Sequence, residues 1–113
     1  MKLLITAKGP NLDSPIDKRF GRGEYFVIVD TDSKSIIESF HNEYLNNEHG
    51  VGIKTATLTL EKGVDAVITG SYGPKAYDVL KQGTLKLYVF TNENTVQDVL
   101  DNFEKGNLKE FTE

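Results

Sequence analysis

The chain has 113 residues, a formal net charge of −4, 38% apolar residues and no cysteine. This length suits one domain, residues 1–113, that buries a core without disulfides, and the lack of cysteine excludes thiolate catalysis and cysteine-held metal sites. The acidic balance argues against nucleic acid as a partner. No run is apolar enough for a membrane span or a secretory signal, so we expect a cytoplasmic protein with no membrane partner. We also expect a monomer.

The N-terminal half predicts three strands and a long loop. Apolar residues 3–7 form a short run typical of a buried strand, and residues 8–23 follow with two prolines and three glycines, as expected for a loop. Loops of this length in a compact domain are usually functional or disordered. Residues 25–30 and 35–40 are rich in β-branched and aromatic side chains, and the polar turn at 31–34 joins them into a hairpin.

The C-terminal half alternates helices with strands. Helical spacing of apolar residues predicts helices at 51–62, 75–81 and 96–105, and apolar runs predict strands at 66–69 and 85–90. We expect the polar tail after Gly106 to be loose. The order β-β-β-α-β-α-β-α predicts an α/β domain with a mixed sheet covered by helices.

The direction of the chain predicts where a ligand would bind. The hairpin and the strand–helix–strand crossovers bring the loops to one edge of the sheet, at the carboxyl ends of most strands; these loops are residues 8–23, 41–50, 70–74 and 91–95. Ligands of open α/β sheets bind outside this edge. We therefore expect one concavity there that brings Arg22 and His49 to the same side of the molecule.

The chain has only two arginines, and both lie in the segment Arg19–Phe20–Gly21–Arg22. A guanidinium group is a planar fork of donors that fits an oxyanion, and glycine lets a ligand approach the backbone closely. The segment therefore predicts an anion-binding loop, to which Lys18 adds charge. An alternative is that both arginines pair with nearby acids and only fasten the loop; the acids are Asp13, Asp17 and Glu24.

Two glycine-containing turns precede predicted helices at the same edge. One turn consists of Gly70, Ser71, Tyr72 and Gly73, and the other begins with His49 and Gly50. The free amides of a helix start favour anions, so we expect both turns to line the site, although ordinary connecting turns look similar. His49 is the candidate metal ligand of the chain, with a surface or capping role as its alternative, whereas a structural role suits His41 better.

The carboxylates do not form a catalytic set. A two-metal hydrolase would need an acid within the first strand, and residues 3–7 contain none. A metal-dependent phosphoester hydrolase is therefore the weakest alternative. A small regulatory or interaction protein with an anion pocket is the stronger one.

Four segments of the chain, Arg19–Arg22 with Tyr25–Phe26 and residues 49–52, 63–70 and 73–76, together resemble the dinitrogenase iron–molybdenum cofactor biosynthesis family. This family includes NifX-like proteins and the C-terminal part of NifB-like proteins. The resemblance covers residues 2–108 and rests on Arg19–Phe20–Gly21–Arg22 with Tyr25–Phe26, on His-Gly-Val-Gly at 49–52, on Gly-Val-Asp-Ala-Val-Ile-Thr-Gly at 63–70 and on Gly-Pro-Lys-Ala at 73–76. The chain looks like a stand-alone short member. It differs from many relatives at Ser71 and Tyr72, where a small or amide-bearing pair is common.

This resemblance implies a fold and a function. The implied fold is a three-layer α/β/α, ribonuclease H-like domain with a five-stranded mixed sheet whose second strand is antiparallel. The implied function is non-enzymatic binding, carriage or transfer of an iron–sulfur or iron–molybdenum type cluster, or of its precursor, between donor and acceptor proteins. Arg19 and Arg22 would then hold an acidic part of the ligand, His49 would be the candidate ligand to metal, and residues 70–73 would line the pocket.

Overall fold

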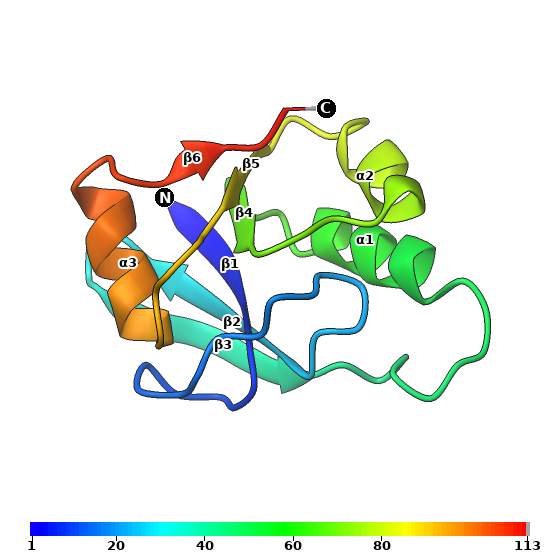
Figure 1. The fold of residues 1–113 in the computed structure, drawn as a ribbon, viewed down its shortest axis with the longest axis horizontal. Helices are drawn as coiled ribbons and strands as arrows, with labels where there is room; N and C mark the ends of the chain where they lie inside the picture. The colour runs from blue at the N-terminus through cyan, green and yellow to red at the C-terminus, as the bar shows by residue number, and fades with distance from the viewer. Residues whose placement is uncertain (113) are drawn as a thin grey trace.

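The computed structural model describes residues 1–112, which form one mixed sheet and three helices (Figure 1). The strands are β1 (Lys2–Ala7), β2 (Tyr25–Asp30), β3 (Ser35–His41), β4 (Ala66–Thr69), β5 (Lys86–Val89) and β6 (Lys109–Glu110). The helices are α1 (Val51–Glu61), α2 (Pro74–Leu80) and α3 (Val96–Glu104). Each strand and helix expected from the sequence is present, with no bound shifted by more than one residue.

The sheet has the strand order β3-β2-β1-β4-β5-β6, with β1 near its centre. β2 runs antiparallel to β1 and β3, which confirms the antiparallel second strand, and β4 and β5 run parallel to β1. The register between β2 and β3 shifts after Ile28, where Ile37 is the extra residue on the edge strand. Strand β1 therefore joins the antiparallel hairpin to the parallel crossovers.

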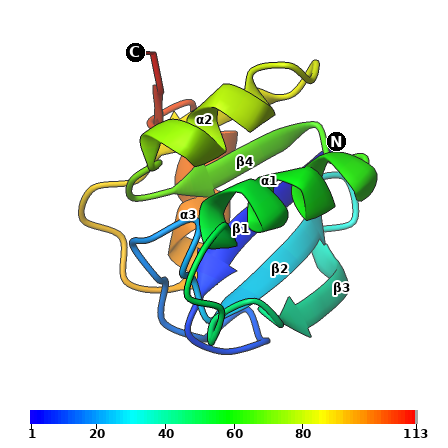
Figure 2. The same cartoon turned by 90° about the vertical axis from the view of Figure 1, so that its right-hand side faces the viewer.

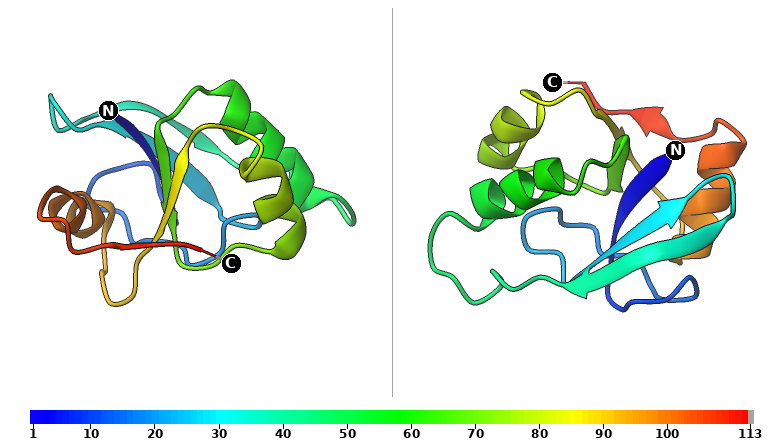
Figure 3. Two further views of the ribbon diagram at one scale, coloured as in Figure 1. Left: turned by 90° about the horizontal axis from the view of Figure 1, so that it is seen from above. Right: turned by 180° about the vertical axis from the view of Figure 1, so that it is seen from behind.

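Side chains alternate between the two faces of the sheet, and each face has its own core. Leu3 and Ile5 of β1 pack with α3, whereas Leu4 of the same strand packs with residues of α1 and α2. The seen-from-above view in Figure 3 has α3 on one side of the sheet and α1 and α2 on the other. The three-layer α/β/α arrangement is confirmed, and the ribonuclease H-like relationship stays a prediction.

The expectation of five strands and a loose tail is wrong, because the tail adds β6 to the edge of the sheet. β6 pairs antiparallel with β5, and the Phe111 amide donates a hydrogen bond to the Leu87 carbonyl at 2.7 Å. The Phe111 ring lies 4.8 Å from the Tyr72 ring and 5.3 Å from the Tyr77 ring, measured between centroids. These aromatic contacts hold a polar segment that has little apolar surface of its own.

The loops after β1, β3, β4 and β5 lie near one another at one edge of the sheet, at the lower left of Figure 2, as the topology predicts. Within residues 1–112, none of the helices has the length and apolar character needed to cross a membrane.

Candidate functional site

A cavity of about 530 Å³ opens at this edge, between the long loop and the starts of α1 and α2. Three segments line it. The long loop contributes Arg19, Phe20, Gly21 and Arg22, the start of α1 contributes Val51 and Gly52, and the turn and first residues of α2 contribute Ser71, Gly73, Pro74, Lys75 and Ala76. Both arginines thus line the same cavity as two helix starts, and the volume of this cavity is within the size range of ligand pockets.

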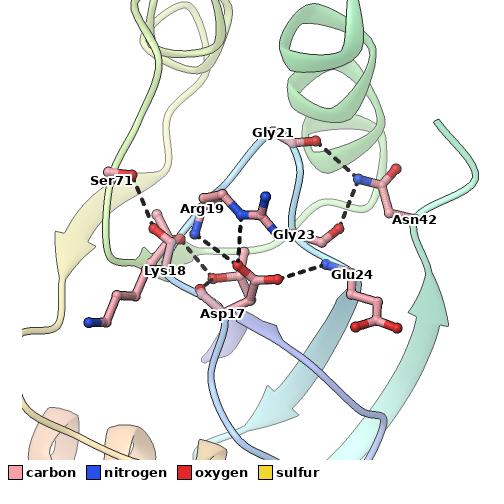
Figure 4. Close-up of polar contacts among 10 residues, drawn as sticks. Asp17, Lys18, Arg19, Gly21, Gly23, Glu24, Asn42 and Ser71 are labelled. Carbon is pink, nitrogen blue, oxygen red and sulfur yellow. Dashed lines mark hydrogen bonds and ion pairs between the residues drawn. The ribbon is translucent and has the colours of Figure 1, made fainter. Parts of the chain in front are cut away.

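The loop between β1 and β2, residues 8–24, is called the arginine loop here. Hydrogen bonds hold its residues 18–20 against the turn before α2. The Phe20 amide donates to the Ser71 carbonyl at 3.2 Å, and the Ser71 hydroxyl donates to the Lys18 carbonyl at 3.1 Å (Figure 4). Gly70 permits this approach, because a Cβ atom at this position would lie 2.8 Å from the Lys18 carbonyl oxygen. The two segments therefore meet as neighbouring strands do, and the position of Arg19 follows from them.

Asn42 fixes residues 21–23 of the arginine loop. Its side-chain amide donates to the carbonyls of Gly21 and Gly23, at 3.0 Å each, and its side-chain oxygen accepts from the Tyr44 amide. The Thr55 hydroxyl on α1 also donates to the Gly21 carbonyl, at 3.2 Å. Asn42 is 1% exposed, so these hydrogen bonds replace those that water would make. Nothing in the local sequence distinguishes this buried asparagine from its solvated neighbours.

The starts of α1 and α2 lack side-chain caps. Gly50 and Gly73 occupy the N-cap positions, neither first turn contains an acidic residue, and Gly50 takes the left-handed conformation with φ 74°. α3, which lies away from the cavity, has a full capping box between Thr95 and Asp98. Uncapped helix starts keep their amide donors free, and at the eleven-residue α1 they add a partial positive charge beside the arginines.

Among residues 1–112, three cationic side chains line the cavity and no carboxylate does; the cations are Arg19, Arg22 and Lys75. Arg19 is paired, since its Nε lies 3.4 Å from Asp17 Oδ1. In residues 1–112, neither Arg22 nor Lys75 forms an ion pair, and the Arg22 guanidinium donates only to the Leu45 carbonyl, at 3.4 Å. The alternative of loop-fastening arginines therefore describes Arg19 in part and does not describe Arg22.

Of the ten predicted site residues, the cavity lining includes six: Arg19, Phe20, Gly21, Arg22, Ser71 and Gly73. The lining does not include Gly70, which lines a second hollow with Lys18, or Gly50, which caps α1. His49 is exposed in the loop before α1, two residues from the lining residue Val51. Among residues 1–112 no group of three or more acids and histidines is placed to hold a metal ion.

Tyr72 points into the protein instead of into the cavity. Its hydroxyl lies 3.1 Å from the Val67 carbonyl and 2.9 Å from the Tyr88 carbonyl, and its one proton can be donated to either. Its ring packs 5.8 Å from the ring of Phe20, which is 1% exposed and forms the floor of the cavity. Burial raises the pKa of the Tyr72 hydroxyl well above its usual range. Tyr72 therefore supports the site from below.

Five lining residues were not predicted: Val51, Gly52, Pro74, Lys75 and Ala76. All five lie in the motifs at 49–52 and 73–76 that carry the family resemblance, but four of them are small or apolar, so no chemical signal of their own marks them as lining residues. Lys75 does carry one, because a cation in the first turn of a helix opposes the helix dipole unless an anion lies nearby.

Comparison with known proteins agrees with this architecture. The family model described as "Dinitrogenase iron-molybdenum cofactor" matches residues 1–106. An uncharacterized protein of Methanocaldococcus jannaschii is 34% identical over 118 residues, covering 98% of this chain and 99% of the relative.

Two solved structures combine clear sequence identity with a close fold. The apo form of the orange protein from Desulfovibrio gigas is 31% identical with a TM-score of 0.90, covering 98% of this chain and 92% of that one. A putative NifB protein from Thermotoga is 36% identical with a TM-score of 0.82, covering 99% and 97%. The chain belongs to the dinitrogenase iron-molybdenum cofactor family, as the resemblance of its loop motifs predicted.

Proposed function

We propose that this protein binds and carries an anionic metallocluster of the iron–sulfur or iron–molybdenum type, or its precursor, in the cavity between the arginine loop and α1. The observation that carries the proposal is the lining, which has three cations, no carboxylate and two uncapped helix starts in a protein of net charge −4. Such a lining attracts a multiply charged anion and contains no acidic group that would repel it.

The chemistry of the lining also indicates how the cluster would be held. The lining contains no thiolate, imidazole or carboxylate, so a cluster in the cavity would keep its own inorganic ligands and bind through charge and shape. The apolar side chains of Phe20, Val51 and Pro74 suit the polarisable sulfide face of such a cluster. His49 is the nearest imidazole along the chain, and we propose it as a metal ligand at the rim.

Carriage rather than catalysis suits this site. No side chain of the lining is placed to act as a nucleophile with a neighbouring base, and Ser71 uses its hydroxyl on the Lys18 carbonyl. The orange protein was solved in its apo form, which is the form without a bound group, and this supports a ligand-binding role for this chain as well. Cluster donor and acceptor proteins would then be its partners.

Anaerobic reconstitution tests the proposal. The protein is mixed with ferrous iron, sulfide and molybdate, desalted, and assayed for retained metal and sulfide and for visible absorption. We expect retention by wild type and a loss of about tenfold in affinity for Arg22→Ala, since one charge-assisted contact is removed. Lys86→Ala, which removes an exposed cation outside the cavity, is the matched control. Equal retention by wild type and Arg22→Ala would contradict the proposal.

His49→Ala separates the two modes of binding. If His49 ligates metal, the variant loses retained metal and changes the absorption spectrum. If charge and shape hold the cluster alone, His49→Ala behaves like wild type while Arg22→Ala does not. Should wild type retain no cluster but gain thermal stability from molybdate, the role of a regulatory protein with an anion pocket replaces that of a carrier.

A further inference from the structure

The carboxylate of Asp17 lies directly beneath the arginine loop and is almost fully buried. The residue is 3% exposed, and its backbone is fixed to β1: the Asp17 amide donates to the Thr6 carbonyl at 3.0 Å, and the Thr6 hydroxyl donates to the Asp17 carbonyl at 2.5 Å. The Thr6 hydroxyl in turn lies 2.7 Å from the Thr69 hydroxyl on β4. Asp17 thus stands on the two central strands of the sheet, which makes it a rigid support.

Three donors surround this carboxylate, and all belong to the loop itself (Figure 4). Oδ1 accepts from the Arg19 amide at 3.1 Å and from Arg19 Nε at 3.4 Å, and Oδ2 accepts from the Glu24 amide at 3.2 Å. Only a side chain with acceptors at both ends satisfies this arrangement. An asparagine would turn its NH₂ group toward either Arg19 or Glu24 and face donor with donor.

We propose that Asp17 is a positioning residue that aims Arg19 at the ligand of the cavity. Asp17 engages Arg19 through Nε, the two terminal nitrogens of the guanidinium have no hydrogen-bond partner within residues 1–112, and Arg19 lines the cavity. Figure 4 shows the end of Arg19 extending beyond the contact with Asp17. A guanidinium held at Nε presents its outer edge as a planar, two-pronged donor for one edge of an oxyanion or thioanion.

The two arginines then have different tasks. Arg19 is held in place before the ligand arrives, so it loses little conformational freedom on binding. Arg22, whose guanidinium has only the Leu45 carbonyl as a partner in the described part of the chain, adapts to the ligand. This inference rests on the proposed function only in needing an anion in the cavity, and it does not depend on which anion that is.

The proposal makes a prediction opposite in sign to simple electrostatics. Asp17→Asn removes a negative charge near the cavity, which by Coulomb's law alone would tighten anion binding. If Asp17 aims Arg19, the same variant weakens binding, because the guanidinium loses its anchor. Asp13→Asn is the matched control, since Asp13 is exposed in the same loop and its side chain touches no donor within residues 1–112.

Arginine-specific ¹⁵N labelling tests the anchor in the free protein. The chain has two arginines, so the spectrum contains two Nε–H signals, and Arg22→Lys assigns them. We expect the Arg19 Nε–H signal of wild type to be protected from exchange with water, and to lose that protection in Asp17→Asn but not in Asp13→Asn. Equal protection in Asp17→Asn and wild type would overturn the proposal.

Titration with molybdate, followed by amide NMR shifts, tests whether Asp17 orients Arg19 toward the ligand. Asp17→Asn and Arg19→Ala should each weaken molybdate binding by about fivefold or more, and Asp17→Asn should not weaken it further in the Arg19→Ala background. If Asp17 acts only by holding the backbone of the loop, Asp17→Asn would weaken molybdate binding in the Arg19→Ala variant too, and this result would overturn the proposal. So would molybdate binding by Asp17→Asn that is as tight as in wild type.

Arg19→Lys provides a second test if Asp17→Asn fails to fold. The side chain at this position is 64% exposed, and the lysine keeps the positive charge, so the variant should fold. A lysine ammonium drawn to Asp17 has no second edge for the ligand, so Arg19→Lys should bind molybdate as weakly as Arg19→Ala. Binding like that of wild type would refute the fork. Failed cluster retention with intact, Asp17-dependent molybdate binding would remove the proposed function and leave this inference standing.

Discussion

Gly70→Ala should separate the arginine loop from the turn before α2. The new Cβ atom would lie 2.8 Å from the Lys18 carbonyl oxygen and 3.0 Å from the Lys18 Cα, and both are backbone atoms that cannot rotate away. Overpacking of this kind costs about 1–3 kcal/mol. The loop can relieve the clash by moving away, but it then loses two hydrogen bonds to Ser71, at about 1 kcal/mol each.

Both routes are consistent with a destabilisation of about 2 kcal/mol, which lowers the melting temperature of a domain of this size by about 10 °C. Gly73→Ala is the matched control in the same turn, because a Cβ atom there has no neighbour within 4 Å and φ is −70°. Urea denaturation of the two variants measures the difference. A Gly70→Ala protein no less stable than Gly73→Ala would refute the close approach of the loop to the turn.

Three further predictions concern the supports of the site. The folded protein keeps the Tyr72 proton because burial raises the pKa of its hydroxyl, whereas the unfolded chain releases that proton near pH 10. Above pH 10 the free energy of unfolding should therefore fall more steeply in wild type than in Tyr72→Phe, by about 1.4 kcal/mol per pH unit. Equal slopes in urea denaturation at a series of pH values would contradict this. Asn42→Ala leaves the Gly23 carbonyl without its donor and should cost about 2–3 kcal/mol by urea denaturation, against a change below 0.5 kcal/mol for Asn46→Ala in the exposed loop nearby. Phe111→Ala should lower stability by about 2 kcal/mol through the lost contacts with Tyr72 and Tyr77, and faster amide exchange at Phe111 would identify β6 as the element released, whereas unchanged exchange would contradict its anchoring role.

The order of the elements followed from the sequence because it depends on local signals. Apolar runs such as residues 66–69 are buried on both sides of a central strand, and glycines end the helices. The shared edge of the loops then followed from chain direction alone. Arg19, Arg22 and Ser71 could be assigned to one site without coordinates because topology, rather than any contact, brings them together.

The directions of individual polar side chains could not be predicted in the same way. Asp17 and Asn42 resemble solvated loop residues, and their burial depends on partners that the fold brings to them, such as the amide of Glu24 and the carbonyl of Gly21. Tyr72 lies between Ser71 and Gly73 in a turn, which suggests a surface position, yet its hydroxyl lies within hydrogen-bond distance of carbonyls on two strands. β6 was missed because its anchor, Phe111, packs on residues far away in the chain.

The hollow itself depends on the small residues around it. A Cβ atom on Gly21 would lie 3.1 Å from the Gly52 Cα, and one on Gly52 would lie 3.5 Å from the Ala76 Cβ. The loop, α1 and α2 therefore approach one another closely, which brings helix starts and guanidinium groups to one hollow. Larger residues here would fill the cavity while leaving both arginines in place, so charge alone does not make this site.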